Sequence, residues 1–319
     1  MRIFSIPYSS LYDPILYLQF VQKYKSFIHS IYFGYFQDHT TQNLNNLTNL
    51  KIFLEESYLE VPRVLAINKT FFNLTSNDIK NLAKDQIIPF LKKYKIESIT
   101  IADYFLASII KQAIPEIIIQ VSCNAFLYSS MQYKAWKDLG ASIINVPREA
   151  LRVPELLKSA RQTCNELGLK LKALVNEACL IDCPQYISHA CLRSLDISDS
   201  NSEYYYCTRK EWKYEDLLKT NFILPRHLKS FDKYVDIYKI AGRDYFNLEQ
   251  LLYVLESYLN ESNDCNLFSL ITIKSAIRKK FIKQIPIKAI SDKILTCEAK
   301  DCDSCHICNK VISKLIKDA

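Results

Sequence analysis

"SITIADYFLASIIKQAIPEIIIQVS", residues 98–122, contains two short apolar runs on either side of a helix-length amphipathic segment. The runs 98–103 and 116–122 are rich in β-branched residues, which is typical of buried strands. The segment between them has the length of a crossover helix and ends at Pro115. The stretch therefore predicts a strand, a helix and a second strand that runs parallel to the first.

The same pattern recurs along the chain, where most of the apolar runs are separated by helix-length amphipathic segments. The eight runs are RIFSIP (2–7), SIYFGYF (30–36), RVLAIN (63–68), SITIAD (98–103), EIIIQVS (116–122), SIINVP (142–147), LKLKALVNE (169–177) and VDIYKIAG (235–242). Eight strand–helix units favour a closed parallel barrel over an open sheet, so we expect an α/β protein with a TIM-like (β/α)8 barrel. We place the barrel at residues 1–245 and a helical extension with a cysteine-rich tail at residues 246–319.

Composition narrows the classes of function. The chain has 319 residues but only four glycines, too few for a dinucleotide fingerprint or a glycine-rich phosphate loop. No apolar run reaches the roughly 18 residues of a membrane span, and the start of the chain does not resemble a signal peptide, so we expect a cytoplasmic protein. Eleven cysteines in such a protein favour metal or cluster binding over disulfides.

The net charge of +7 permits a polyanionic partner without requiring one. Basic residues concentrate in IKSAIRKKFIKQIPIK (273–288), which is typical of a cationic helix face. We interpret this face as solvated surface. The contact of this segment with RNA or with a partner protein stays open.

Polar residues follow several of the predicted strands, where a barrel of this kind keeps its active site. They are Asp103, Ser122 with Cys123 and Asn124, Arg148 with Glu149, Asn176 with Glu177, and Gly242 with Arg243. For each residue alone, a role as helix cap or turn residue is the simpler interpretation. Together they predict a polar rim at one end of the barrel.

The stretch LVNEACLIDCPQYISHACLRS (174–194) brings three cysteines and a histidine to this rim. If Cys179 and Cys183 lie on a helical turn, they share one face and can bind one metal. Cys191 and Cys207 are the nearest residues to complete a set of four thiolates, which suits an iron–sulfur cluster of the 4Fe–4S type, or zinc. The irregular gaps favour the cluster. Burial as small apolar residues is the alternative.

The tail LTCEAKDCDSCHICNKV holds a second group of cysteines, Cys297, Cys302, Cys305 and Cys308. The last three are spaced by two residues each, as in the ligand runs of small ferredoxin-like sites. We therefore predict a metal site here, with a second iron–sulfur cluster or zinc as the metal. Cys123, Cys164 and Cys265 stand apart from both groups, and Cys164 is expected in the core.

Hydrolysis has no recognisable apparatus, because the sequence lacks a G-x-S-x-G turn and an H-E-x-x-H helix. His189 is close enough in sequence to suggest a base for a cysteine nucleophile. Proximity in sequence is weak support for such a pair.

The sequence also resembles peptidase family U32, the collagenase-like peptidases. The resemblance rests on IYFGYF (31–36), IADYF (101–105), SIINVPRE (142–149), LVNEACLIDCPQYISH (174–189) and FDKYVDIYKIAGR (231–243). It implies a barrel catalytic domain and, in several members, an oxygen-sensitive four-iron cluster held by cysteines near the rim. The family name records proteolysis, whereas other members support oxygen-independent hydroxylation of RNA bases or of a quinone precursor.

The resemblance assigns Cys179 and Cys183 to the family's cysteine block. It places Glu177, His189, Lys239 and Arg243 at polar positions of the motifs and implies a catalytic role for them. The third and fourth ligands do not carry over: Cys191 matches no family position, Cys207 lies in a variable insertion, and the tail lies outside the shared segment.

Three functional hypotheses follow. The first is an iron–sulfur enzyme of the oxygen-independent hydroxylation or modification type, in which Lys239 and Arg243 hold an anionic or carbonyl group. In a simpler interpretation these two residues pair with Glu149 or Glu177. The second hypothesis is a peptidase with His189 or Glu177 as base. The third is a non-catalytic cluster or zinc protein. The substrate stays open among RNA, a small aromatic or quinone-type molecule and a peptide, and a partner protein or a dimer is also compatible.

Overall fold

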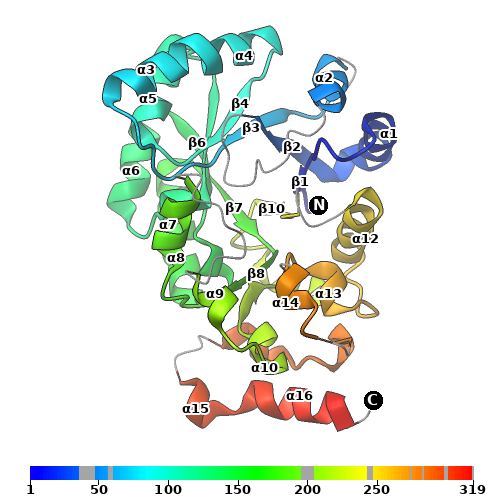
Figure 1. Ribbon diagram of the computed structural model, residues 1–319. Coiled ribbons are helices and arrows are strands. Elements are labelled where there is room, and N and C mark those ends of the chain that lie inside the picture. Colours follow the sequence, from blue (N-terminus) through cyan, green and yellow to red (C-terminus); the bar gives the residue numbers. More distant parts are fainter. Residues whose placement is uncertain are drawn as a thin grey trace.

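The computed structural model describes residues 1–35, 47–56, 60–194, 205–242, 247–273, 275–281, 284–297 and 301–317. It contains a closed barrel of eight parallel strands in the order β1-β10-β7-β6-β5-β4-β3-β2 (Figure 1). The strands are β1 (Phe4–Pro7), β2 (Ile28–Gly34), β3 (Arg63–Ile67), β4 (Ser98–Ile101), β5 (Ile118–Val121), β6 (Ala141–Asn145), β7 (Lys170–Leu174) and β10 (Ile237–Lys239). Each falls within one of the eight apolar runs, apart from the first two residues of β2 and the first residue of β6, so the predicted (β/α)8 barrel is confirmed.

Helices cover the outside of this barrel (Figure 1). They are α1 (Pro14–Tyr24), α2 (Leu47–Glu55), α3 (Ser76–Leu82) with α4 (Ile88–Lys93), α5 (Tyr104–Ala113), α6 (Ser130–Asp138), α7 (Pro154–Leu167) and α12 (Leu248–Leu259). Side-chain caps start several of them: Asp103 accepts from the backbone N–H of Leu106 at 2.6 Å, and Ser129 forms a capping box with Gln132. Asp103 is thus a helix cap, the simpler of its two predicted roles.

The interior of the barrel is polar. Lys172 donates to Oε1 of Gln120 at 2.5 Å, and the Gln120 amide donates to Oγ of Ser98 at 2.9 Å. On the other side, the hydroxyls of Ser5 and Ser30 are 2.9 Å apart. Interiors of such barrels are ordinarily filled by branched apolar side chains. Here a hydrogen-bonded network takes their place, and it satisfies the buried donors and acceptors that it contains.

His29 lies at an irregular point of β2. Phe4 of β1 pairs with Ile28, whereas the next residue, Ser5, pairs with Ser30, so His29 is the extra residue of a bulge. Burial, together with the positive charges of Lys172 and Lys170, lowers the pKa of His29 from 6.5 to about 4. The imidazole is therefore neutral in the folded protein at neutral pH.

This shift predicts acid sensitivity. The unfolded chain, with its ordinary pKa of 6.5, takes up the proton first, so the stabilisation is complete above pH 6.5 and is lost as the pH falls towards 4. In His29→Gln, the fall in the free energy of unfolding across this pH window should be smaller than in wild type by on the order of 1–2 kcal/mol. This value is reduced because His29 is partly exposed. Urea unfolding at a series of pH values measures it, with exposed His306→Asn as control. Parallel pH curves for wild type and His29→Gln would contradict the assignment.

A second, small sheet leaves the barrel at the end of β7. It pairs β8 (Asn176–Leu180) antiparallel with β9 (Thr220–Phe222). Between them lie α8 (Tyr186–Ser194), α9 (Tyr206–Arg209) and α10 (Tyr214–Leu218), and beyond β9 come α11 (Leu228–Phe231), α13 (Leu267–Leu270), α14 (Ser275–Arg278), α15 (Cys302–Cys305) and α16 (Ile307–Lys317). In Figure 1 this sheet and the C-terminal helices lie together beside one end of the barrel.

The predicted cationic helix in 273–288 is much shorter than its sequence suggests, because α14 spans only four residues. Arg278, Lys279 and Lys280 are exposed there. Lys274 and Lys283 lie outside the described residues. Elsewhere in the described chain, no helix is long and apolar enough to cross a membrane.

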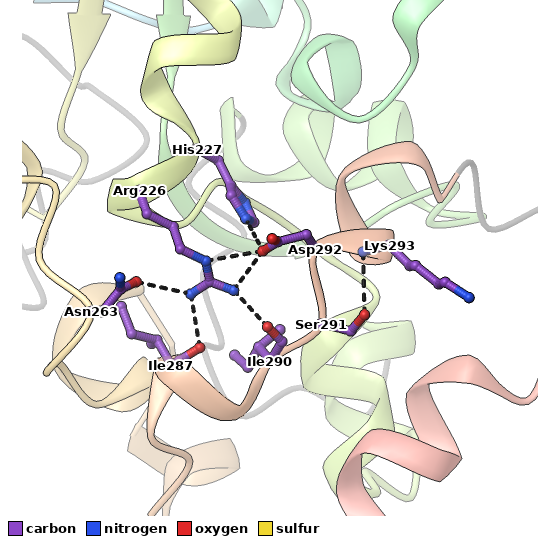
Figure 2. Close-up of polar contacts among 8 residues, drawn as sticks. All are labelled: Arg226, His227, Asn263, Ile287, Ile290, Ser291, Asp292 and Lys293. Carbon is purple, nitrogen blue, oxygen red and sulfur yellow. Dashed lines mark hydrogen bonds and ion pairs between the residues drawn. The ribbon is translucent and has the colours of Figure 1, made fainter.

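The region after residue 245 packs closely on the barrel. The Tyr258 hydroxyl of α12 donates to the carbonyls of Val175 and Ile223, at 3.0 and 2.8 Å. The later segment 284–297 is held by Arg226, which follows β9 (Figure 2). Its guanidinium donates to the carbonyls of Ile287 and Ile290 and pairs with Asp292 at 2.9 Å. The predicted division at residue 245 stays a prediction.

Arg226→Met removes these contacts while keeping the aliphatic stem. Two carbonyls lose their donor and Asp292 keeps only its contact with His227, so we expect a loss of about 2–3 kcal/mol for the attachment of segment 284–297. Limited proteolysis should then cut the variant faster than wild type within this segment. The matched control is Arg278→Met, at an exposed arginine on α14. Equal cleavage rates in wild type and Arg226→Met would show that the segment is held by other contacts.

Candidate functional site

The candidate site lies where the chain leaves β7 and becomes β8. Asn176 holds this turn and is completely buried. Its side-chain amide donates to the carbonyls of Ala241 and Leu270, at 3.1 and 3.0 Å, and its Oδ1 accepts from the N–H of Ala241 at 2.8 Å. The backbone carbonyl of Asn176 accepts from the N–H of Thr272. One asparagine thereby fixes β8 to the end of β10 and to the segment after α13.

Arg148 and Glu177 form the centre of the site. Arg148 opens the 3-10 turn η4 (Arg148–Leu151) after β6, and one of its terminal nitrogens lies 3.0 Å from Oε1 of Glu177. The other donates to Oδ1 of Asn124 at 2.9 Å, and the guanidinium lies 5.3 Å from the ring centre of Tyr186. All these residues belong to the rim or to α8 beside it. Glu177 thus pairs with Arg148, whereas the predicted pairing of Lys239 and Arg243 with Glu149 or Glu177 stays a prediction, since Arg243 lies outside the described residues.

The electrostatics of the rim connect this ion pair with several thiols. Burial acts to lower the pKa of Arg148, but the negative potential of Glu177, Tyr186, Cys123 and Cys179 outweighs it and raises the pKa well above its usual value. Oε2 of Glu177 is buried and has no hydrogen-bond partner among the described residues. The guanidinium is therefore a fixed positive charge against which anionic ligands can be held.

Two of the predicted ligands, Cys179 and Cys183, feel this charge, and a third, Cys207, acts on both of them. Burial raises the pKa of Cys179 to about 12, Arg148 opposes the shift, and Glu177, Cys183 and Cys207 add to it. Burial likewise raises the pKa of Cys183, with Cys207 adding to the shift and Arg148 opposing it. Cys179, Cys183 and Cys207 thus form one electrostatically coupled group, which we call the rim thiols.

The local geometry differs from the predicted helical turn. Cys179 lies on the extended strand β8, and Cys183 lies in the turn that follows it. Asp182 adopts a left-handed conformation with φ of 52°, which aspartate tolerates better than most residues, and so reverses the chain before Pro184. The alternation of β8 and this turn, and not a helical face, bring the two thiols to the same end of the barrel.

The remaining predicted residues are distributed more widely. Cys191 is half-buried on α8, and His189 of the same helix packs on the ring of Tyr205 at 4.3 Å. Lys239 ends β10 inside the barrel, with its amine 4.2 Å from the ring centre of Tyr32. Arg243 lies outside the described residues. The structure therefore brings Glu177 to the rim thiols and places His189 and Lys239 at other points of the barrel end.

Cys123 is a residue that sequence reasoning set apart. It begins the 3-10 turn η3 (Cys123–Ala125) after β5, is buried, and contributes to the potential at Arg148. Its position directly after the fifth strand had placed it among the predicted rim residues, but not among the predicted ligands. Cys164, expected in the core, is fully buried on α7.

A cavity of about 660 Å³ adjoins the rim thiols through Cys183. Its other lining residues are Tyr128, Glu149, Leu180, Asp182, Pro184, Tyr186, Ile187, Ser188 and Asn221. The Tyr128 hydroxyl donates to Glu149 at 2.6 Å. Two tyrosines and several aliphatic side chains form apolar walls, whereas the carboxylates of Glu149 and Asp182 give the cavity negative charge. A volume of this size suits a small organic molecule or a single base or side chain of a larger one.

The described side chains do not yet form a closed metal site. Among them, no three histidine, cysteine or acidic side chains lie close enough together to hold one metal ion. The donors nevertheless suit a soft metal in kind, since Cys179 and Cys183 share Arg148 as a cationic neighbour and Cys207 lies near both thiols. Closing the ligands around a cluster therefore requires movement of the turn 181–185 and of α9, because ligand sites seldom exist fully formed before the metal binds.

A parallel barrel with a thiol-rich, polar rim at the carboxyl ends of its strands defines the class of this protein. The model of peptidase family U32 matches residues 21–254, most of the chain, and the chain belongs to this family. It is 28% identical over 237 residues to the uncharacterized protease MJ1657 of Methanocaldococcus jannaschii, covering 71% of this chain and 68% of the relative. The U32 peptidase Mk0906 has the same fold, with a TM-score of 0.56 and 11% identity over 76% of this chain and 93% of that one.

The turn into β8 supplies a test of the site's construction. Asn176→Ala removes three side-chain hydrogen bonds and leaves buried backbone groups unpaired, so we expect a loss of about 3 kcal/mol of stability. Urea unfolding measures this loss, and faster alkylation of Cys179 in the folded variant reports loosening of β8. Asn77→Ala, at an exposed position of α3, is the control. A stability and an alkylation rate equal to wild type would contradict the role assigned to Asn176.

Proposed function

We propose that this U32 protein is an iron–sulfur enzyme of the oxygen-independent hydroxylation or modification type, acting at the mouth of its barrel. The observation that carries the proposal is the grouping of Cys179 and Cys183 beside Arg148, with Cys207 near both thiols and next to a cavity that Cys183 itself lines. Cys179, Cys183 and Cys207 would hold the cluster, with Cys191 as the fourth ligand predicted from the sequence. A bound cluster supplies one-electron transfer at the cavity wall.

The protein's own residues prepare this place in three ways. Arg148 offsets the negative charge of bound thiolates, and Glu177 fixes the guanidinium through their 3.0 Å ion pair. Partial burial of Cys179 limits the access of water to this residue, which helps to protect a reactive group and to tune its potential. Asn176 holds β8 to the barrel, so the thiols and the cavity keep a fixed relation to the strands.

The cavity favours one of the three predicted substrate classes. Tyr128 and Tyr186 offer aromatic faces, and Leu180 and Ile187 complete an apolar wall. The carboxylates of Glu149 and Asp182 repel phosphate groups, which makes a polyanion such as RNA less suited to this wall than a neutral aromatic or quinone-type ring. We therefore propose a small aromatic compound as the substrate.

Peptide hydrolysis is the second candidate function. The relative in Methanocaldococcus jannaschii is described as a protease, and Glu177 has one buried carboxylate oxygen without a hydrogen-bond partner among the described residues. A carboxylate in this state could activate a water molecule. The other predicted base, His189, packs on Tyr205.

Anaerobic purification followed by absorption spectroscopy and assays of iron and sulfide tests the first proposal. We expect a coloured protein in which Cys183→Ser loses about four irons per chain, the content of one 4Fe–4S cluster. Cys164→Ala, at a buried cysteine of α7, is the matched control and should keep its iron. A colourless wild-type protein without iron would overturn the proposal.

The same samples separate the two functions. If the cluster is required, conversion of an aromatic substrate should disappear with the iron in Cys183→Ser. If the protein is a hydrolase, peptide cleavage should survive removal of iron and be lost in Glu177→Gln. Cleavage that survives iron loss would transfer the assignment to the second candidate.

A further inference from the structure

Arg152 is a buried cation whose purpose the rim site does not explain. It follows η4 directly, four residues after Arg148, and its side chain is among the largest that are fully buried. One terminal nitrogen donates to the carbonyl of Thr220 at 2.8 Å, and the other lies 3.5 Å from that of Leu218. The guanidinium thereby joins the barrel to the start of β9 and the end of α10.

These two carbonyls do not balance the charge of Arg152. Its Nε is buried and has no hydrogen-bond partner among the described residues, and none of the ion pairs found there includes this arginine. Removing an unpaired guanidinium from water costs several kcal/mol. A buried arginine in this state calls for an anion nearby.

Among the described residues, the groups whose negative potential acts on Arg152 are thiols. Cys297 and Cys308 both contribute negative potential at Arg152, and Cys297 lies within hydrogen-bonding reach of the guanidinium. Cys297 follows the 3-10 turn η7 (Asp292–Thr296), whereas Cys308 is buried on α16, 11 residues later. Helix α16 packs against α10 (Figure 1). Leu218, the last residue of α10, carries the carbonyl that Arg152 contacts.

Ordinary cysteine thiols are mostly neutral at pH 7, so by themselves they do not compensate a guanidinium. Cysteines become permanently anionic when they bind a metal. Four thiolates around one divalent metal, or around a 4Fe–4S cluster in its 2+ state, carry a net charge of about −2. A buried arginine that donates to such sulfurs is the counter-charge that this centre requires.

We propose that Cys297, Cys302, Cys305 and Cys308 form a second, separate thiolate-bound metal centre, which uses Arg152 as its counter-charge and fastens the C-terminal helices to β9 and α10. This proposal does not depend on the function of the rim. Its two independent supports are the C-x2-C-x2-C spacing and the buried Arg152 with its unpartnered Nε.

The backbone of the tail suits this centre. Cys302 and Cys305 mark the two ends of α15, a single turn. His306 then adopts a left-handed conformation with φ of 50°, which ends the turn and lets α16 begin in a new direction, with Cys308 at its second position. The side chain of Cys302 lies outside the described residues, and Cys305 is exposed. Metal binding would draw Cys305 towards Cys297 and Cys308.

Two metal species fit four thiolates, and analysis of the whole chain distinguishes them. Zinc, iron and acid-labile sulfide are measured in anaerobically purified protein, for wild type and for Cys297→Ser/Cys308→Ser. We expect the double variant to lose either one zinc per chain or about four irons with their sulfide, the contents of one tetrathiolate zinc site or one 4Fe–4S cluster. Cys164→Ala should lose neither. Identical metal contents in wild type and double variant would overturn the proposal.

A measurement on the wild-type chain guards against misfolding of the variant. Alkylation of the four tail cysteines, located by mass spectrometry, should be at least tenfold slower before metal removal by a chelator than after it. Equal rates before and after chelation would overturn the proposal whatever the variants do. Arg152→Met keeps all four ligands, and we expect it to weaken metal retention about 10–100-fold in competition with a chelator. Unchanged metal retention in Arg152→Met would show that Arg152 is not part of the centre.

The rim and the tail can be separated in the same experiment. Cys179→Ser/Cys183→Ser should keep the tail metal and the slow alkylation of the tail cysteines. A protein that holds tail metal but no rim iron would end the proposed redox function and leave this inference intact. The reverse result, rim iron with freely reactive tail cysteines, would overturn this inference and leave the proposed redox function intact.

Discussion

The hydrogen bonds of Asn176 determine where the chain leaves the barrel, and the candidate site depends on them. Its side chain holds the end of β10 and the segment after α13 at the same time. Because the amide has both donors and an acceptor occupied, few other residues could satisfy all these buried backbone groups. The strand that starts at Asn176 carries Glu177 and Cys179 to the rim, so a local polar contact sets the position of the chemistry.

One short segment after β6 supplies the positive charges of both thiol groups. Arg148 opens η4 and faces Glu177, Cys123 and Cys179, whereas Arg152 directly follows η4 and faces Cys297 and Cys308. The two cations thus lie at the two ends of one four-residue 3-10 turn. The rim and the tail are therefore linked mechanically, although their proposed ligands are separate.

The barrel itself could be predicted from the sequence, because each strand lies almost entirely within a short apolar run. Most of these runs are separated by amphipathic segments of helix length. The rim was also predictable, since the ends of parallel strands meet at one end of a closed barrel. The strand conformation of Cys179 could not be predicted, because β8 pairs with β9, which lies about 40 residues later in the chain. In addition, the spacing of two cysteines looks the same in sequence whether the chain is helical or extended.

Partners that come from distant segments were likewise hidden. Nothing in the sequence around Glu177 points to Arg148, and the link between Arg152 and Cys297 joins residues far apart in the chain. The predicted helix at 273–288 failed for a related reason: its charges suggested one exposed face, but β-branched residues and Pro286 break the segment into a four-residue helix and turns.

The two proposals together give this fold two separate thiolate-bound metal centres, one beside Arg148 and one beside Arg152. Anomalous scattering from anaerobically grown crystals, recorded at the iron and zinc absorption edges, locates such metals directly. The account predicts an iron peak among Cys179, Cys183 and Cys207 beside Arg148 and a distinct iron or zinc peak among the tail cysteines beside Arg152. The absence of a peak at both places, or one peak shared by the two cysteine groups, would contradict it.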